Sequence, residues 1–192
     1  MRIVGGRMRG RQLVAPEDDA TRPTSDRVRE AIFNILAHGI PEFSLERARV
    51  LDLFAGTGAL GLEALSRGAA YCLFVEEAAA ARAAVRRNVE ALGLTGVTKI
   101  YRRDATQLGP ASGRDRFDLA FLDPPYGQGL AERALSSAAA GGWLAHDALA
   151  VIEEHKDAVV VPPGNFLVLD RRSWGDTQVT FARYARSASV TG

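Results

Sequence analysis

The segment that most constrains the fold is a short apolar run followed at once by closely spaced glycines. Residues 51–61 read Leu-Asp-Leu-Phe-Ala-Gly-Thr-Gly-Ala-Leu-Gly. Gly-x-Gly-x-x-Gly after a strand and at the start of a helix is typical of a nucleotide-binding turn, because glycines let the backbone approach a ligand. We therefore predict a strand, a turn and a helix, with Phe54, Gly56 and Gly58 in a cofactor-binding loop. A purely structural tight turn is the alternative.

A carboxylate follows the next apolar run at the spacing that such a site requires. Glu76 comes 20 residues after Gly56 and directly after a predicted strand over 71–75. An acid in this place accepts hydrogen bonds from ribose hydroxyls. We therefore expect Glu76 to bind the cofactor, although the neighbouring Glu77 is a second candidate for the same role.

Apolar runs and helical patterns alternate through most of the chain. Strands are expected at 50–54, 71–75, 97–101, 117–122, 149–152, 166–169 and 179–184, and helices at about 28–38, 60–68, 81–92 and 129–140. Alternation of this kind indicates an α/β fold with a mostly parallel sheet and helices on both faces. The last two strands are expected to close the sheet as an antiparallel pair.

Asp52 favours one class of cofactor over another. It lies four residues before the first glycine of the turn, where its charge would repel the pyrophosphate of a dinucleotide at the helix N-terminus. S-adenosyl-L-methionine carries no phosphate, and its ammonium and sulfonium groups are cations. We therefore expect this cofactor, with turn capping by Asp52 as the alternative. Asp104, after the third predicted strand, is placed to reach the adenine amino group, or else is a surface turn residue.

The most specific chemical signal is the tetrapeptide Asp123-Pro124-Pro125-Tyr126 after the fourth predicted strand. In an open parallel sheet, ligands bind beyond the carboxyl ends of the strands, where the first and fourth strands would be neighbours. Prolines lack N–H donors, so the carbonyl groups and the Asp123 carboxylate form rigid acceptors that suit an exocyclic amine. Tyr126 adds an aromatic face on which an extruded base can stack.

Arginine is concentrated at the N-terminal end. The net charge of the chain is only +1, yet residues 1–29 contain seven arginines against four acids. Residues 1–16 are punctuated by glycines and are predicted to form a hairpin. Its arginines, whose planar guanidinium groups suit phosphate, are Arg2, Arg7, Arg9 and Arg11.

Other features exclude several classes of protein. One cysteine, Cys72, rules out an intramolecular disulfide framework, and the three histidines show no metal-ligand spacing. No apolar run is long enough to cross a bilayer, and the start of the chain does not look like a secretion signal. We therefore expect a cytoplasmic protein that needs no metal and no membrane.

These motifs together resemble those of the bacterial 16S ribosomal RNA guanine-N2 methyltransferases that act on guanine 966, a class I methyltransferase family. The similarity runs over nearly the whole chain and includes residues 1–11, 22–30, 51–64 and 123–126. The Asp-Pro-Pro-Tyr signature is shared with adenine-N6 enzymes. The arginine-rich start joined to Arg22-Pro23-Thr24 is the feature that favours guanine.

The resemblance implies a Rossmann-like class I fold with a seven-stranded sheet and an N-terminal β-hairpin extension. It implies S-adenosyl-L-methionine held by Asp52, Gly56 and Gly58, with Glu76 at the ribose and Asp104 near the adenine. It also implies that the hairpin arginines, Arg22 and Thr24 help to place 16S rRNA within a partly assembled small subunit. The enzyme is expected to act as a monomer, with the flipped base held against the Asp123–Tyr126 tetrapeptide during in-line transfer.

The expected organisation is an RNA-positioning extension over residues 1–40, a methyltransferase domain over 41–186 and a disordered tail over 187–192. Two other functions compete with guanine-N2 methylation. One is an adenine-N6 DNA or RNA methyltransferase, which shares the tetrapeptide but normally needs an added nucleic-acid-reading region. The other is a non-catalytic RNA-binding module on a methyltransferase fold.

Overall fold

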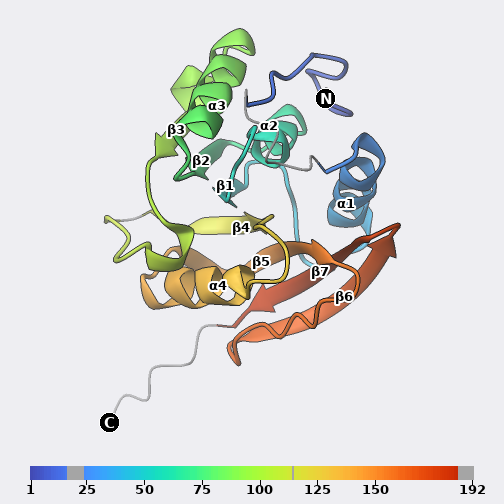
Figure 1. Ribbon diagram of the computed structural model, residues 1–192, viewed down its shortest axis with the longest axis vertical. Helices are drawn as coiled ribbons and strands as arrows, with labels where there is room; N and C mark the ends of the chain where they lie inside the picture. The colour runs from blue at the N-terminus through green and yellow to red at the C-terminus, as the bar shows by residue number, and fades with distance from the viewer. Residues whose placement is uncertain (17–23, 114, 186–192) are drawn as a thin grey trace.

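A mostly parallel sheet forms the centre of the molecule (Figure 1). The structure is a computed structural model that describes residues 1–16, 24–113 and 115–185. In this part of the chain seven strands lie in the order β3-β2-β1-β4-β5-β7-β6. They are β1 (Arg49–Leu53), β2 (Tyr71–Val75), β3 (Thr98–Tyr101), β4 (Phe117–Leu122), β5 (Leu144–His155), β6 (Phe166–Trp174) and β7 (Thr177–Tyr184). The pairing is parallel from β3 to β5 and antiparallel from β5 to β7 and β6. This confirms the predicted α/β class and the antiparallel closing pair.

Helices cover both faces of the sheet, as predicted. The described helices are α1 (Asp26–His38), α2 (Ala59–Ser66), α3 (Ala79–Ala91) and α4 (Leu130–Ala140), with short 3-10 turns η1 (Thr95–Val97) and η2 (Ala105–Gln107). Apolar side chains of α1, α2 and α3 share one core with one face of the sheet, and those of α4 share a second core with the other face (Figure 1). Within the described residues no helix is long and apolar enough to cross a membrane.

The order of the strands places a topological switch point between β1 and β4. Leu53 at the end of β1 pairs with Val75 of β2 on one side and with Leu122 of β4 on the other. The three strands therefore end at the same edge, and the chain leaves them toward opposite faces. Ligands bind at such a switch point in open α/β sheets. The prediction that the first and fourth strands are neighbours is confirmed.

Three sequence predictions differ clearly from the structure. The predicted strand 166–169 is too short, because β6 continues to Trp174 in its pairing with β7. The predicted strand 149–152 is too short, because β5 begins at Leu144 and continues to His155. Its polar carboxyl end stays in the sheet because β7 pairs with it as far as His155. The predicted N-terminal hairpin has one antiparallel bridge, between Arg2 and Gln12, and no named strands. Contacts with α2 and α3, described below, supplement this limited pairing.

Gly61 lets α2 pack directly against the sheet. A methyl group in place of its hydrogen would lie 2.5 Å from both Cys72 Sγ and Phe74 Cε1, and 3.0 Å from Asp52 Oδ2. These three side chains are all buried. The third glycine of the motif is therefore required by close packing of helix and sheet, which is one of the roles that the motif predicts.

Gly61→Ala should lower the free energy of unfolding by about 2 to 3 kcal/mol, because the added methyl group overfills a packed core. Urea denaturation of the two proteins measures this difference. Gly96→Ala is the matched control, since a methyl group there meets no atom within 4 Å, and we expect a change of less than about 0.5 kcal/mol. Equal losses in the two variants would contradict the packing argument.

Candidate functional site

The glycine loop lies at the carboxyl end of β1 and is fixed by backbone hydrogen bonds. Phe54, the first residue after the strand, has φ +59°, a conformation that costs a non-glycine residue of order 1 kcal/mol or more. The next residue, Ala55, donates its N–H to the carbonyl group of Val75 (3.1 Å), and Gly58 donates to that of Ala55 (2.7 Å). The loop therefore turns back over the end of β2, toward the predicted ribose ligand.

Glu76 is the carboxylate that meets this loop. Its Oε2 accepts a hydrogen bond from the Gly56 N–H (2.9 Å), and its Oε1 accepts one from the Ala78 N–H (2.8 Å). Each carboxylate oxygen has a further lone pair for a ligand hydroxyl. The neighbouring Glu77 is exposed, and the structure gives it no contact with the loop. The geometry therefore favours Glu76 over Glu77 as the ribose ligand.

The Gly56 backbone is accessible to a ligand. A methyl group added at Gly56 would meet only the Phe54 carbonyl oxygen, at 4.0 Å, so the space above this backbone is open. The fixed Glu76 carboxylate borders the same backbone. An open backbone surface beside a held acid suits a ligand with ribose hydroxyls and no phosphate, as S-adenosyl-L-methionine has.

Asp52 lies beneath the loop, in the core. Its side chain is only 2% exposed, and its Oδ2 accepts a hydrogen bond from the Gly61 N–H at 3.0 Å. Burial raises the pKa of Asp52 to about 8, against the lowering effect of the Gly61 hydrogen bond and with a smaller raising effect from Glu76. The carboxyl group therefore braces the first turn of α2, as the turn-capping alternative predicts, and is largely protonated near neutral pH. The expected repulsion of a pyrophosphate by its charge is therefore not supported.

The raised pKa of Asp52 predicts a pH-dependent stability. Since the folded state holds the proton more tightly than the unfolded chain, stability is present at low pH and is lost as the pH rises toward about 8. Replacing the acid with a neutral amide removes this loss. Relative to wild type, Asp52→Asn should therefore gain up to about 1.4 kcal/mol of unfolding free energy per unit between pH 5 and 8. Urea denaturation at several pH values measures the difference.

Asp104 provides a control with the opposite electrostatics. Hydrogen bonds from the hydroxyl and backbone N–H of Thr106 lower the pKa of Asp104, so its stabilising effect is lost only as the pH falls below the ordinary aspartate range. The stability difference between Asp104→Asn and wild type should be flat from pH 5 to 8. Parallel behaviour of the two variants would contradict the assignment of the slope to Asp52.

Asp104 begins the short turn η2 rather than extending into open space. Its Oδ1 accepts from the Thr106 N–H (2.8 Å) and hydroxyl (2.7 Å), and its Oδ2 accepts from Gln107 Nε2 (3.2 Å). Both carboxylate oxygens of Asp104 therefore accept hydrogen bonds from residues of η2. The predicted contact of Asp104 with adenine remains a prediction.

The Asp123-Pro124-Pro125-Tyr126 tetrapeptide follows β4 at the same edge, and a threonine hydroxyl reaches its acid. Thr24 Oγ1 lies 3.2 Å from Asp123 Oδ2 and 2.6 Å from Glu153 Oε2. Desolvation and then the Glu153 carboxylate raise the pKa of Asp123 well above its usual range, while the Thr24 hydrogen bond lowers it. Two acids, one directly after β4 and one within the adjacent β5, therefore converge on one hydroxyl group.

Tyr126 borders a cavity of about 500 Å³ beside these acids. Its hydroxyl donates to Glu153 Oε1 (3.3 Å) and lies 3.4 Å from Thr177 Oγ1. Burial raises the pKa of Tyr126 to about 12, so the hydroxyl keeps its proton. The cavity lies between the start of α1 and the turn that joins β6 to β7, and its lining includes Thr24, Arg27, Tyr126, Glu153, Trp174 and Thr177.

Glu153 is the site residue that the sequence analysis missed. It directly follows the predicted strand 149–152, just as Asp123 directly follows 117–122. Leu122 pairs with Ile152 in the parallel β4–β5 ladder. Asp123 and Glu153 are the residues that follow this pair, so they lie beside each other. An acid directly after a second buried strand was therefore the available signal.

Thr24, predicted to contact RNA, is buried between these acids.

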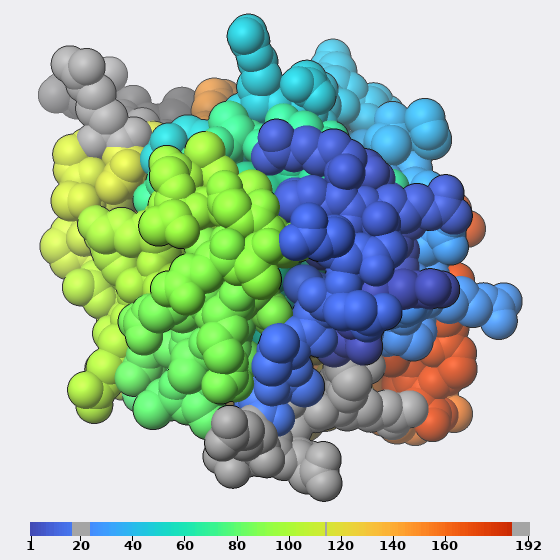
Figure 2. Space-filling view, turned by 90° about the horizontal axis from the view of Figure 1, so that it is seen from above, coloured from blue at the N-terminus to red at the C-terminus, as the bar shows by residue number. Residues whose placement is uncertain are grey.

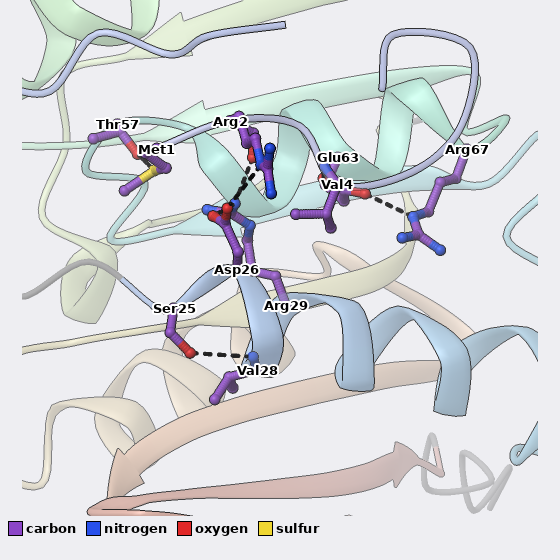
Figure 3. A network of polar contacts seen from close by, with 10 residues as sticks. All are labelled: Met1, Arg2, Val4, Ser25, Asp26, Val28, Arg29, Thr57, Glu63 and Arg67. Atoms are coloured by element: carbon purple, nitrogen blue, oxygen red, sulfur yellow. Dashed lines mark hydrogen bonds and ion pairs between the residues drawn. The ribbon is translucent and has the colours of Figure 1, made fainter. Parts of the chain in front are cut away.

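The N-terminal segment is attached to the rest of the molecule by buried polar groups (Figure 3). Glu63 in α2 is fully buried, accepts the Val4 N–H at 2.8 Å and pairs with Arg67 at 2.7 Å. The equally buried Arg29 donates to the Arg2 carbonyl group (2.5 Å) and pairs with Asp26 (2.7 Å). These contacts fix the start of the chain between α1 and α2.

The turn of this segment lies on the C-terminal end of α2. A methyl group at Gly6 would lie 2.1 Å from the Ser66 carbonyl oxygen, so a larger residue could not approach as closely. Arg7 N–H donates to that carbonyl (2.9 Å), and Met8 N–H donates to Ser66 Oγ (3.0 Å). At the other end, Asn88 of α3 exchanges two hydrogen bonds with the Val14 backbone.

The predicted RNA-binding arginines have different surroundings. Arg7 and Arg9 are exposed and, within the described residues, form no ion pair. Arg2 pairs with Asp26 at 3.2 Å, and Arg11 donates to the Ala91 carbonyl group at 2.7 Å. Figure 2 shows the N-terminal segment as a broad dark-blue surface beside the green residues that include α3. Arg22 and the predicted tail 187–192 lie outside the described residues.

No metal site is found in the part of the chain that the structure describes. It contains no group of three or more histidine, cysteine, aspartate or glutamate side chains that could hold a metal ion. Cys72 is buried in β2, and burial raises the pKa of its thiol. The thiol is therefore a packed core group, as its place in an apolar strand predicts.

Comparison with known proteins identifies the family. A family model described as conserved hypothetical protein 95 matches residues 1–183. The chain belongs to this family. Ribosomal RNA small subunit methyltransferase D of Escherichia coli strain K12 is 37% identical over 189 residues, covering 98% of this chain and 91% of that protein. The Haemophilus influenzae protein of the same name is 34% identical over 177 residues, covering 91% and 89%.

Solved structures agree with this relationship. The Escherichia coli protein yhhF superimposes with a TM-score of 0.81 at 32% identity, covering 97% of this chain and 99% of that one. A hypothetical protein of Thermus thermophilus, TTHA0928, gives 0.73 at 31% identity, with coverages of 94% and 98%. The fold is that of a class I methyltransferase, and the family resemblance inferred from the motifs is confirmed.

Proposed function

We propose that this chain transfers a methyl group from S-adenosyl-L-methionine to the exocyclic N2 of a guanine in 16S rRNA. The observation that carries the proposal is the position of Asp123, which follows β4 at the switch point beside the glycine loop and next to the cavity bordered by Tyr126. The names of the Escherichia coli and Haemophilus influenzae relatives support ribosomal RNA as the substrate.

The cofactor is assigned to the glycine loop. The backbone of Gly56 and Gly58 faces the cofactor, and Glu76 holds the ribose. Asp52 supports the loop from the core through its hydrogen bond with Gly61. Phe54, directly after β1, and Asp104, after β3, are the remaining cofactor-binding candidates. Bound S-adenosyl-L-methionine supplies an electrophilic sulfonium methyl group.

The remaining residues prepare the amine. The lone pair of guanine N2 is delocalised into the ring, so the amine is a weak nucleophile. Hydrogen bonds from the amine to the Asp123 carboxylate and the Pro124 carbonyl group orient it, and fixing this orientation contributes several kcal/mol. The carboxylate also stabilises the positive charge that develops on nitrogen. Asp123 then accepts the released proton and passes it to water, while Pro125 and Tyr126 keep the loop rigid and cover the base.

The N-terminal segment is assigned to RNA. Arg7 and Arg9 present cations on a surface that buried contacts with α2 hold in place. Together with Arg11 and Arg22 they would contact phosphates of a small-subunit precursor in the cytoplasm, with the enzyme acting as a monomer. Arg2 contributes less, because it is already paired with Asp26.

Methylation of ribosomal RNA from a strain that lacks this protein tests the proposal. The purified chain is incubated with S-adenosyl-L-methionine and either deproteinised 16S rRNA or partly assembled small subunits, and the nucleosides are identified by mass spectrometry. We expect N2-methylguanosine at one position, with assembled particles as the better substrate. N6-methyladenosine instead, or no methylated nucleoside, would reject the proposal.

A further inference from the structure

Glu153 lines the cavity beside Tyr126 to which the proposed function assigns the target base. Its side chain is only 4% exposed, yet it lines the cavity together with Thr24 and Tyr126. The Tyr126 hydroxyl holds Oε1 at 3.3 Å, and the Thr24 hydroxyl holds Oε2 at 2.6 Å. Glu153 is therefore a carboxyl group held in a defined orientation beside the place where the base must bind.

The carboxyl groups of Glu153 and Asp123 lie side by side. Both lie within hydrogen-bond distance of the Thr24 hydroxyl, Glu153 Oε2 at 2.6 Å and Asp123 Oδ2 at 3.2 Å. A hydroxyl group has one proton and can satisfy one acceptor fully at a time. A ligand that brings two adjacent N–H donors to this place would therefore match the pair.

Guanine presents such donors, and adenine does not. The Watson–Crick edge of guanine carries the exocyclic N2 amine directly beside N1–H. In adenine the exocyclic amine lies beside N1, whose lone pair would face a carboxylate. A site built to hydrogen-bond one group discriminates strongly against an analogue that leaves its buried polar atoms unmatched.

We propose that Glu153 accepts a hydrogen bond from N1–H of the target guanine while Asp123 accepts one from the exocyclic amine, so that the carboxyl pair selects guanine. This inference rests on the proposed function and explains a choice that the Asp-Pro-Pro-Tyr signature alone does not make. Glu153 is then a specificity-determining residue, contributed by β5, and Thr24 and Tyr126 are the positioning residues that orient it.

The test replaces the target guanine with 2-aminopurine, which keeps the 2-amino group but has a lone pair at N1. Partly assembled small subunits are prepared with either base at the position mapped as above, and kcat/KM is measured for each. Wild type should favour guanine by about 100-fold or more. In Glu153→Gln the side-chain amide can accept from N1–H or donate to N1, so the ratio should fall to about 10-fold or less.

Glu154→Gln is the matched control. Its carboxylate accepts from the backbone N–H groups of Gly127 and His155 and does not line the cavity, so the ratio should stay at the wild-type value. An unchanged ratio in Glu153→Gln, or a wild-type enzyme that treats both bases alike, would overturn the inference. Failure of wild type to methylate the guanine particle would instead reject the proposed function.

Binding measurements decide the case in which Glu153→Gln is inactive on both substrates. The fluorescence of 2-aminopurine rises when the base leaves its stack, so it reports entry into the site. Competition between guanine and 2-aminopurine particles should show a preference for guanine in wild type and little preference in Glu153→Gln. Retention of the wild-type preference would overturn the inference.

Discussion

Asp123→Ala should lower kcat at least about 1000-fold, while the Kd for S-adenosyl-L-methionine changes less than about threefold. The variant loses both the acceptor that orients the amine and the charge that stabilises the developing cation, and each effect is worth about 100-fold or more. The cofactor is assigned to Gly56, Gly58 and Glu76, whereas the Asp123 carboxylate accepts its hydrogen bond from Thr24, which is not part of the glycine loop. Single-turnover methyl transfer and calorimetric titration of the cofactor measure the two quantities.

Asp123→Asn separates orientation from charge. The amide oxygen of asparagine still accepts a hydrogen bond from the amine, but the negative charge is gone, so kcat should lie between those of wild type and Asp123→Ala. A large loss of cofactor affinity, or alanine and asparagine variants as active as wild type, would refute the catalytic assignment.

Local sequence patterns predicted those parts of the site that follow one strand at a time. The glycine loop follows β1, Glu76 follows β2 and the tetrapeptide follows β4. Each acid or turn comes directly after an apolar run, so chain order and parallel pairing suffice to bring them to one edge. The same logic predicted β2 and β4 with their observed bounds.

The rest depends on contacts between distant segments. Thr24 contacts Asp123 and Glu153, which are 99 and 129 residues away in the sequence. No local pattern indicates that a threonine before a helix will form hydrogen bonds with two distant carboxyl groups. The length of β5 is likewise decided by its partner β7 and not by its own polarity. Arg29 reads as one of several N-terminal arginines, yet packing of α1 against the start of the chain buries it completely.

Arg7→Gln/Arg9→Gln should weaken binding of 16S rRNA on the order of 30-fold at 0.1 M salt. Each phosphate contact that is lost reduces the slope of log K against log salt by about 0.7 to 0.9, so two contacts reduce it by about 1.4 to 1.8. The guanidinium groups are exposed on a segment whose backbone is held by Glu63 and Ser66. Little ordering entropy is therefore lost on binding. Filter-binding titrations between 0.05 and about 0.3 M salt cover the range in which the slope is measured.

Two control variants show whether this effect belongs to the exposed arginines of the turn or to net charge. Arg2→Gln removes a cation that Asp26 already neutralises at 3.2 Å, so its slope should change by less than about half a contact. Arg133→Gln removes an exposed arginine from α4, which covers the opposite face of the sheet from α2 and α3, and its slope should equal that of wild type. If the double variant kept the slope of wild type, RNA would not contact the N-terminal turn. If Arg133→Gln lowered the slope as much as the double variant does, attraction between RNA and protein would be spread over the whole surface. A substitution on α4 cannot remove a phosphate contact made by the N-terminal turn.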